Sequence, residues 1–243
     1  MYQEILRKLL PADCLVFFDL EATEIRHQAI SFGMVGLKKK SGKSLGELEE
    51  AFSYHTYLKT EDNIGEFVEN LTGITPELIE KEGKTFSEAL VEILNLLRPF
   101  SKKVYLSYSD SDLMILAHTI HKKINVEDNF FRMISNSYLD LQNYYSKRIL
   151  SEKGKTLSLF KLASLLQVEE EDRKHDALSD SILLKNVFLQ YFKREEDLVY
   201  PLAIRSLQTS VIGKEVKSYL LDEVLAGREV SLSSFEQKVR TLL

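Results

Sequence analysis

The sequence has only one cysteine, no long apolar run and no excess of positive charge among its 243 residues. The single Cys14 excludes an intramolecular disulfide and a zinc cluster held by several thiolates, and it fits a reducing compartment. A net charge of −5 excludes a broadly cationic nucleic-acid binder, although acidic enzymes with local basic patches still act on nucleic acids.

The distribution of apolar residues along the sequence also indicates no segment for export or membrane insertion. No stretch approaches the ~20 apolar residues that a membrane span needs. The first ten residues have helical spacing and include Glu4, which is not the continuous apolar core of a signal peptide. We therefore expect a soluble, cytoplasmic protein with no membrane partner. The sequence also shows no internal repeat and no low-complexity tract.

What is present is a hydrophobic fraction of 44%, enough for a sizeable core. Short apolar or alternating runs predict strands over residues 13–20, 28–38, 48–58, 103–108 and 137–141. Helical spacing and capping residues predict helices over residues 1–10, 64–71, from 76, 85–97, from 112, 156–166 and 176–192.

The order of these elements predicts an α/β fold. Three strands joined by short turns form an antiparallel meander, and later strands that alternate with helices add parallel strands to a mixed sheet flanked by helices. Beyond residue 195, short helices are expected over residues 197–208, 213–226 and 231–242. We predict a main domain over 1–195 and a small helical extension over 196–243, which could also bind a partner or cover the main core.

Two carboxylates, Asp19 and Glu21, directly follow the apolar run Leu15-Val16-Phe17-Phe18. Side chains two apart on a strand share a face. Neighbouring carboxylates at the end of a buried strand repel each other and lose hydration, unless a cation lies between them. The alternative is a strand that ends in a polar turn, and these residues alone leave both interpretations open.

Two further segments carry carboxylates at the start of a predicted helix. Asp110 and Asp112 follow the strand at 103–108, where ligands gather in α/β sheets. Asp176 and Asp180 are four residues apart on one helix face, and His175 precedes them. Acidic residues in a first helical turn also act as caps and complement the helix dipole, so each segment has a structural alternative.

Taken in order, these motifs resemble a known family, the DnaQ-like 3′–5′ exonucleases of the DEDDh type, which have a ribonuclease-H-like fold. Asp19-Leu20-Glu21-Ala22-Thr23 resembles the first family motif, Ser107-Tyr108-Ser109-Asp110-Ser111-Asp112 the second, and His175 with Asp180 the third. The blocks 30–35, 71–75 and 156–159 are similar too, so the resemblance covers roughly residues 13–192. Asp112 is preferred to Asp110 because Leu113-Met114-Ile115-Leu116 follows it.

The resemblance implies a mechanism with two divalent metal ions, Mg²⁺ or Mn²⁺, for which carboxylate oxygens are suitable ligands. It implies that Asp19 bridges the two ions, that Glu21 and Asp180 hold the ion that activates water, and that Asp112 supports the second ion. His175 is implied as the general base, since a neutral imidazole is available near neutral pH.

The same resemblance implies that Leu20, Ala22 and Thr23 hold the 3′ end of the substrate. Asp176 could join the site, but the favoured interpretation is that it caps its helix. The remaining histidines are interpreted as structural or solvated; these are His27, His55, His118 and His121.

The expected activity is therefore 3′–5′ exonucleolytic hydrolysis of single-stranded RNA or DNA, with a nucleic acid bearing a free 3′ end as partner. The run Ser107-Tyr108-Ser109 slightly favours RNA, because the polymerase-proofreading branch of the family usually has His-Asn there. Ser31 departs from the family pattern, in which many members have an acidic or amide residue. The alternative function is a non-catalytic module that binds nucleic acid or protein on the same fold.

Overall fold

A computed structural model describes residues 2–39, 48–120, 126–147, 149, 151, 155–169, 175–193, 213–228 and 230–242. Its strands are β1 (Cys14–Ala22), β2 (Ala29–Lys39), β3 (Leu48–Tyr57), β4 (Lys103–Ser107) and β5 (Tyr138–Asp140). Its helices are α1 (Tyr2–Leu9), α2 (Glu66–Thr72), α3 (Pro76–Glu82), α4 (Phe86–Leu97), α5 (Ser111–Ile120), α6 (Val126–Asn136), α7 (Leu141–Ser146), α8 (Leu159–Leu165), α9 (Ala177–Lys193), α11 (Gly213–Leu225) and α12 (Leu232–Leu242).

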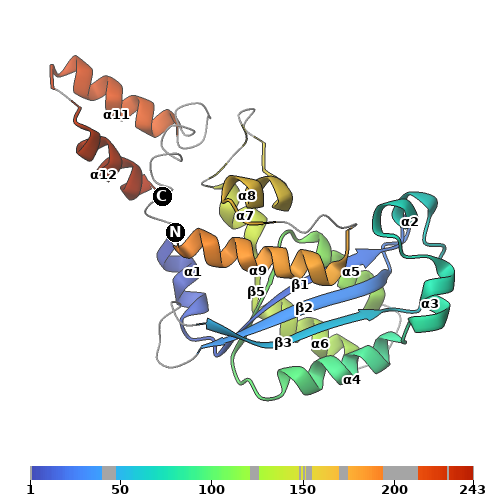
Figure 1. Ribbon diagram of the computed structural model, residues 1–243. Helices are drawn as coiled ribbons and strands as arrows, with labels where there is room; N and C mark the ends of the chain where they lie inside the picture. The colour runs from blue at the N-terminus through green and yellow to red at the C-terminus, as the bar shows by residue number, and fades with distance from the viewer. Residues whose placement is uncertain are drawn as a thin grey trace. The chain divides into compact units, whose positions relative to one another are not determined.

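The five described strands form one mixed sheet in the order β3-β2-β1-β4-β5 (Figure 1). β1 pairs antiparallel with β2 and β2 antiparallel with β3, so the predicted meander is confirmed. β4 pairs parallel with β1, and β5 pairs parallel with β4. The predicted mixed sheet flanked by helices is therefore confirmed, and β1 is its central strand.

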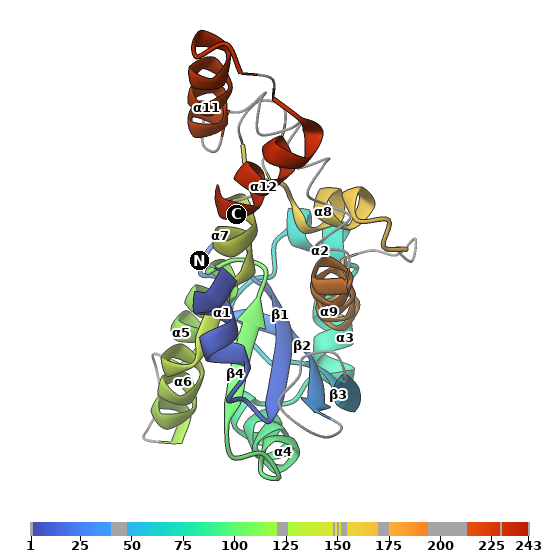
Figure 2. The same cartoon turned by 90° about the vertical axis from the view of Figure 1, so that its left-hand side faces the viewer.

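The two faces of the sheet are covered by different helices. Figure 2 shows α5 and α6 on one side of the strands and α9 on the other. On the α5 side, alternate residues of β1 join a core with apolar residues of α4, α5 and α6, including Phe18, Ile93, Leu116 and Phe130. Because side chains alternate across a strand, the residues between them on β1 face α9. Asp19 and Glu21 belong to that second set.

Several predicted helix boundaries are confirmed by their hydrogen bonds. Gly73 ends α2 in the left-handed conformation, with φ of 77°, which favours glycine. Thr75 begins α3 by accepting a hydrogen bond from the Leu78 backbone N–H at 3.3 Å, with Pro76 in the first turn. The capping box is present at α4, where Thr85 and Glu88 bond reciprocally.

Two described helices, α6 and α7, were not predicted from the sequence. The first half of α6 contains Asp128 and Asn129, which are weak helix formers, so its apolar residues did not stand out as a helical pattern. Phe130 and Ile134 of α6 are nevertheless buried in the core beside α5. Tertiary packing therefore stabilises a helix that local propensity does not predict.

The chain divides into two compact units, which we describe separately. The larger comprises Gln3–Asp140 and Glu170–Lys185, and it contains the sheet. The other comprises Met1–Tyr2, Leu141–Glu169 and Asn186–Leu243. In this second unit aromatic rings of α7 and α9 pack together, with the Tyr145 and Tyr191 ring centroids 4.9 Å apart. The expected helix at 197–208 and the predicted boundary at 195 lie outside the described residues, so the boundary stays a prediction.

Among the described helices, none is both long enough and apolar enough to cross a membrane.

Candidate active site

The site lies where β1 ends, on the face of the sheet that α9 covers. Asp19 is opposite Gly33 of β2, and Glu21 is opposite Ser31. Directly opposed residues of an antiparallel pair project to the same face. Asp19 and Glu21 therefore share this face with the β2 residues on which the start of α9 rests.

Gly33 allows α9 to approach the sheet closely beside Asp19. A Cβ atom at Gly33 would lie 2.2 Å from the backbone of Ala177 and Leu178, at the start of α9. Ser181 of the same helix donates a hydrogen bond from its hydroxyl to the Gly33 carbonyl oxygen at 3.0 Å. The backbone contact and this hydrogen bond hold the first turns of α9, including Asp180, against the strand that neighbours Asp19.

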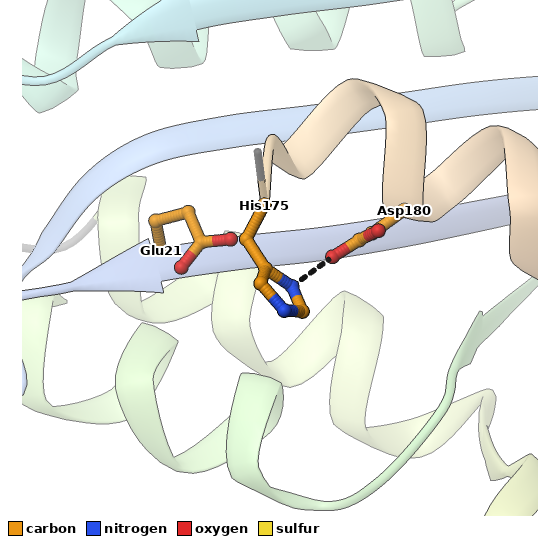
Figure 3. A group of neighbouring side chains, drawn as sticks. All are labelled: Glu21, His175 and Asp180. Atoms are coloured by element: carbon orange, nitrogen blue, oxygen red, sulfur yellow. Dashed lines mark hydrogen bonds and ion pairs between the residues drawn. The ribbon is translucent and has the colours of Figure 1, made fainter. Parts of the chain in front are cut away.

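Three of the predicted site residues meet closely. Glu21, His175 and Asp180 each offer one potential ligand atom, and these three atoms lie within 4.8 Å of one another (Figure 3). The three residues could therefore hold a metal ion together. His175 Nδ1 lies 3.1 Å from Asp180 Oδ2. The Asp180 side chain is 13% exposed and that of His175 is 39% exposed, so the histidine remains accessible to solvent.

Asp112 reaches β1 from α5. Its Oδ1 atom accepts a hydrogen bond from the Leu20 backbone N–H at 3.1 Å, and the residue is only 5% exposed. Asp110, by contrast, is exposed. The structure therefore brings Asp112 next to the Asp19–Glu21 segment, as the preference for Asp112 over Asp110 requires.

The carboxylates of the site destabilise one another's charged forms. Burial, followed by the charges of Asp112, Glu21, Asp180 and Asp176, raises the pKa of Asp19 well above its ordinary value. Every one of these influences opposes ionisation.

Two neighbouring carboxyls behave in the same way. Burial, with the charge of Asp180, raises the pKa of Glu21 to about 7, while His175 opposes the rise. Burial also raises the pKa of Asp112 to about 7, against the hydrogen bond from Leu20. A cluster of this kind is stabilised by cations, so its donor atoms fit divalent metal ions, which prefer carboxylate oxygens.

The three residues predicted to hold the substrate end are less accessible than expected. Leu20 and Thr23 are buried, and Ala22 is half-buried. Thr23 is also engaged locally, since its hydroxyl oxygen accepts a hydrogen bond from the Gln28 backbone N–H at 3.0 Å. The role of these residues in binding stays a prediction, with Ala22 the most accessible of the three.

The other histidines have different surroundings. His27 and His118 are exposed, with nearly parallel rings 6.3 Å apart, and His121 lies outside the described residues. His55, interpreted from sequence as structural or solvated, lies beside Ser31 and Asp176. The sequence did not predict this proximity, because it depends on the register between strands. The alternation of His55 with Tyr57 along β3 did indicate that both side chains lie on one face of the sheet.

Comparison with known proteins agrees with this geometry. The family model described as "RNase_T: Exonuclease" matches residues 16–188, more than half of the chain. The chain belongs to this exonuclease family. The predicted exonuclease activity, that of a nuclease of the hydrolase type, is thereby confirmed. A search of curated proteins finds no match to the chain.

Solved structures of related exonucleases share the fold. The nuclease domain of 3'hExo, a DEDDh family member bound to rAMP, has a TM-score of 0.62 and 18% identity over 75% of this chain and 92% of that one. A 3'-exonuclease that recognises the histone mRNA stem-loop has a TM-score of 0.62 and 17% identity over 79% and 69% of the two chains. E. coli Exonuclease I with a dA16 oligonucleotide has a TM-score of 0.55 and 15% identity over 78% and 43%.

Proposed function

We propose that this exonuclease removes nucleotides from the 3′ end of single-stranded nucleic acid, with Asp19, Glu21, Asp112, His175 and Asp180 as its catalytic residues. The observation that carries the proposal is the meeting of Glu21, His175 and Asp180 within 4.8 Å, beside Asp19 and Asp112. A non-catalytic binding module has no need for a buried cluster of carboxylates that oppose one another's ionisation.

The carboxylates fit a pair of divalent cations, Mg²⁺ or Mn²⁺. Asp19 would bridge the two ions, Glu21 and Asp180 would hold one of them, and Asp112 would support the other. When bound, such ions neutralise the negative charge that develops as a phosphodiester is hydrolysed.

His175 is the residue that takes a proton from the attacking water. Its Nδ1 atom faces a carboxylate oxygen of Asp180 at 3.1 Å. A carboxylate accepts hydrogen bonds, so this contact fits an imidazole that carries its proton on Nδ1. The lone pair is then on Nε2, which makes Nε2 the basic atom. Proton removal by a positioned histidine typically contributes about 10²- to 10⁴-fold to a rate.

RNA is the substrate that we favour. The run Ser107-Tyr108-Ser109 supports this choice, and two structural neighbours are described with rAMP and with a histone mRNA stem-loop. Another neighbour is described with dA16, so DNA is the comparison substrate in the experiment below. We also keep a cytoplasmic location as part of the proposal, on the basis of the single cysteine.

The deciding experiment uses single-stranded RNA and DNA oligonucleotides labelled at the 5′ or the 3′ end, with Mg²⁺, Mn²⁺ or EDTA. The 5′-labelled substrate should give a ladder that shortens from the 3′ end, and the 3′-labelled substrate should release mononucleotide at once. EDTA and Asp19→Ala should abolish both signals, whereas Asp110→Asn should retain activity and Asp112→Asn should lose it. Binding without cleavage in every metal would instead support the non-catalytic module.

A further inference from the structure

The carboxylate of Asp176 uses its two oxygens for different purposes. Oδ2 caps α9, accepting hydrogen bonds from the Ser179 backbone N–H at 2.9 Å and the Ser179 hydroxyl at 2.8 Å. Oδ1 lies 3.4 Å from His55 Nε2, on β3. Helix capping therefore accounts for only one oxygen, and the other faces a side chain of the sheet.

His55 also contacts β2. Its Nε2 atom lies 2.9 Å from the hydroxyl oxygen of Ser31, which is fully buried. Burial lowers the pKa of His55, against the charge of Asp176, so the ring is neutral near neutral pH. A tautomer with its proton on Nε2 directs that proton toward the Ser31 hydroxyl oxygen and the neighbouring Asp176 carboxylate. His55 therefore joins β2 and β3 to the start of α9.

Strand register places this contact in line with the active site. Asp19, Gly33 and His55 are opposite one another across β1, β2 and β3, and Glu21 and Ser31 are opposite one another two residues further along. Because Gly33 has no side chain, the start of α9 rests between Asp19 on one side and His55 on the other. The same turn of α9 is thus held by His55 and presents its other side to the catalytic carboxylates.

We propose that His55 and Ser31 are positioning residues, which hold Asp176 and thereby fix the adjacent His175 against Glu21 and Asp180. The proposal rests on the function proposed above, in which His175 is the general base. His175 directly precedes Asp176, so a displacement of the Asp176 backbone moves the imidazole with it. Misplacement of a catalytic group by about 1 Å can cost about 10²-fold in rate.

The first test replaces the imidazole while retaining a flat ring. His55→Phe removes the Nε2 donor but keeps a ring that can pack edge-on against Tyr57, as His55 does at 4.8 Å. We expect kcat to fall about 10- to 100-fold with KM unchanged within about 2-fold, because an interaction realised only in the transition state is weakened. His55→Gln supplies an amide donor and should recover part of kcat.

The chain offers a matched control for a lost contact between β3 and α9. Lys185 Nζ lies 2.9 Å from Glu50 Oε2 and joins the same two elements far from His175. Lys185→Met removes that contact, and we expect its kcat to stay within about 2-fold of wild type because Lys185 lies ten residues from His175 and does not contact the catalytic residues. A loss of kcat in Lys185→Met equal to that in His55→Phe would overturn the positioning role.

A double-mutant cycle with His175→Ala separates positioning from general loss of structure. If His55 acts through His175, His55→Phe should lower kcat in the wild-type background and change it less than about 2-fold in His175→Ala. Equal losses in both backgrounds would overturn the inference. Ser31→Ala, a smaller change, should lower kcat by less and show the same dependence on His175, which covers the case that His55→Phe does not fold.

The control reactions keep the two proposals distinguishable. Wild-type protein without metal-dependent cleavage from the 3′ end would refute the proposed function, and the positioning role with it. Wild-type activity that depends on Asp19 and His175, combined with additive effects of His55→Phe, would refute the positioning role alone.

Discussion

The catalytic carboxylates should lower the stability of the metal-free protein, and Glu21→Gln tests this directly. In the folded chain Glu21 is half-buried, and its pKa is raised from 4.5 to about 7 by burial and by the charge of Asp180, against the opposing effect of His175. Glutamine has almost the same shape and carries no charge. The variant should therefore fold with the same packing and without the cost of ionising this position.

The size of the effect follows from the pKa. A rise of the pKa from 4.5 to about 7 corresponds to about 3 kcal/mol, at ~1.36 kcal/mol for each pH unit. Relaxation and partial hydration reduce this figure, so we expect Glu21→Gln to raise the free energy of unfolding by about 1 to 3 kcal/mol above pH 7.

The sign depends on pH in a defined way. Near pH 4 the carboxyl is largely protonated in both states, so the gain should be small. As the pH rises from 4.5 to 7, the unfolded chain releases this proton before the folded chain does. Wild-type stability falls over that window relative to the variant, and the gain is complete above pH 7.

The assay is urea denaturation in EDTA at several pH values between 4 and 8, with Glu61→Gln as a control at an exposed position. Addition of Mg²⁺ should stabilise wild type more than Glu21→Gln, since ligands stabilise the state that binds them. The reasoning is refuted if the variant is less stable than wild type at pH 8 in EDTA, or if its gain does not depend on pH.

Other parts of the structure lead to further predictions. Gly33→Ala should displace the start of α9, cost about 1 to 3 kcal/mol and lower kcat at least about 10-fold. Gly36→Ala should retain activity, because the atoms nearest to its added Cβ belong to the Phe52 side chain and not to α9. Denaturation and cleavage rates check both variants. Thr85→Ala should lower stability by about 1 kcal/mol with cleavage unchanged, and an altered cleavage rate would contradict a purely structural role. Cys14, buried and with its pKa raised to about 12, should react with iodoacetamide at pH 8 only after unfolding, as mass spectrometry would show.

The sequence alone was sufficient for features that depend on local physics. Alternation along 28–38 and 48–58 predicted β2 and β3, because the period of a strand is a local property. The capping box at Thr85 predicted the start of α4 for the same reason. The spacing of Asp19 and Glu21 placed both carboxylates on one face without knowledge of what lies opposite. His175 and Asp180 were found through an ordered set of motifs and not through any one of them.

Other features required distances between residues that are far apart in the chain. The weak helix formers Asp128 and Asn129 kept α6 from being predicted, and packing against α5 stabilises this helix in the folded protein. The structure also separated Asp112, in contact with Leu20, from the exposed Asp110, although both begin the same helix. A pattern can place both residues near the end of a strand, but only packing decides which one is buried against it.

Gly33 and His55 show most clearly what tertiary structure decides. From the sequence, Gly33 was one residue of a strand and His55 a structural or solvated histidine. Strand register places both in one row with Asp19, and α9 then rests on Gly33 with Asp176 beside His55. Register and helix packing arise from the burial of whole faces, so no short segment contains that information. The sequence determined which groups can perform the chemistry, and the fold determined which neighbours hold them in place.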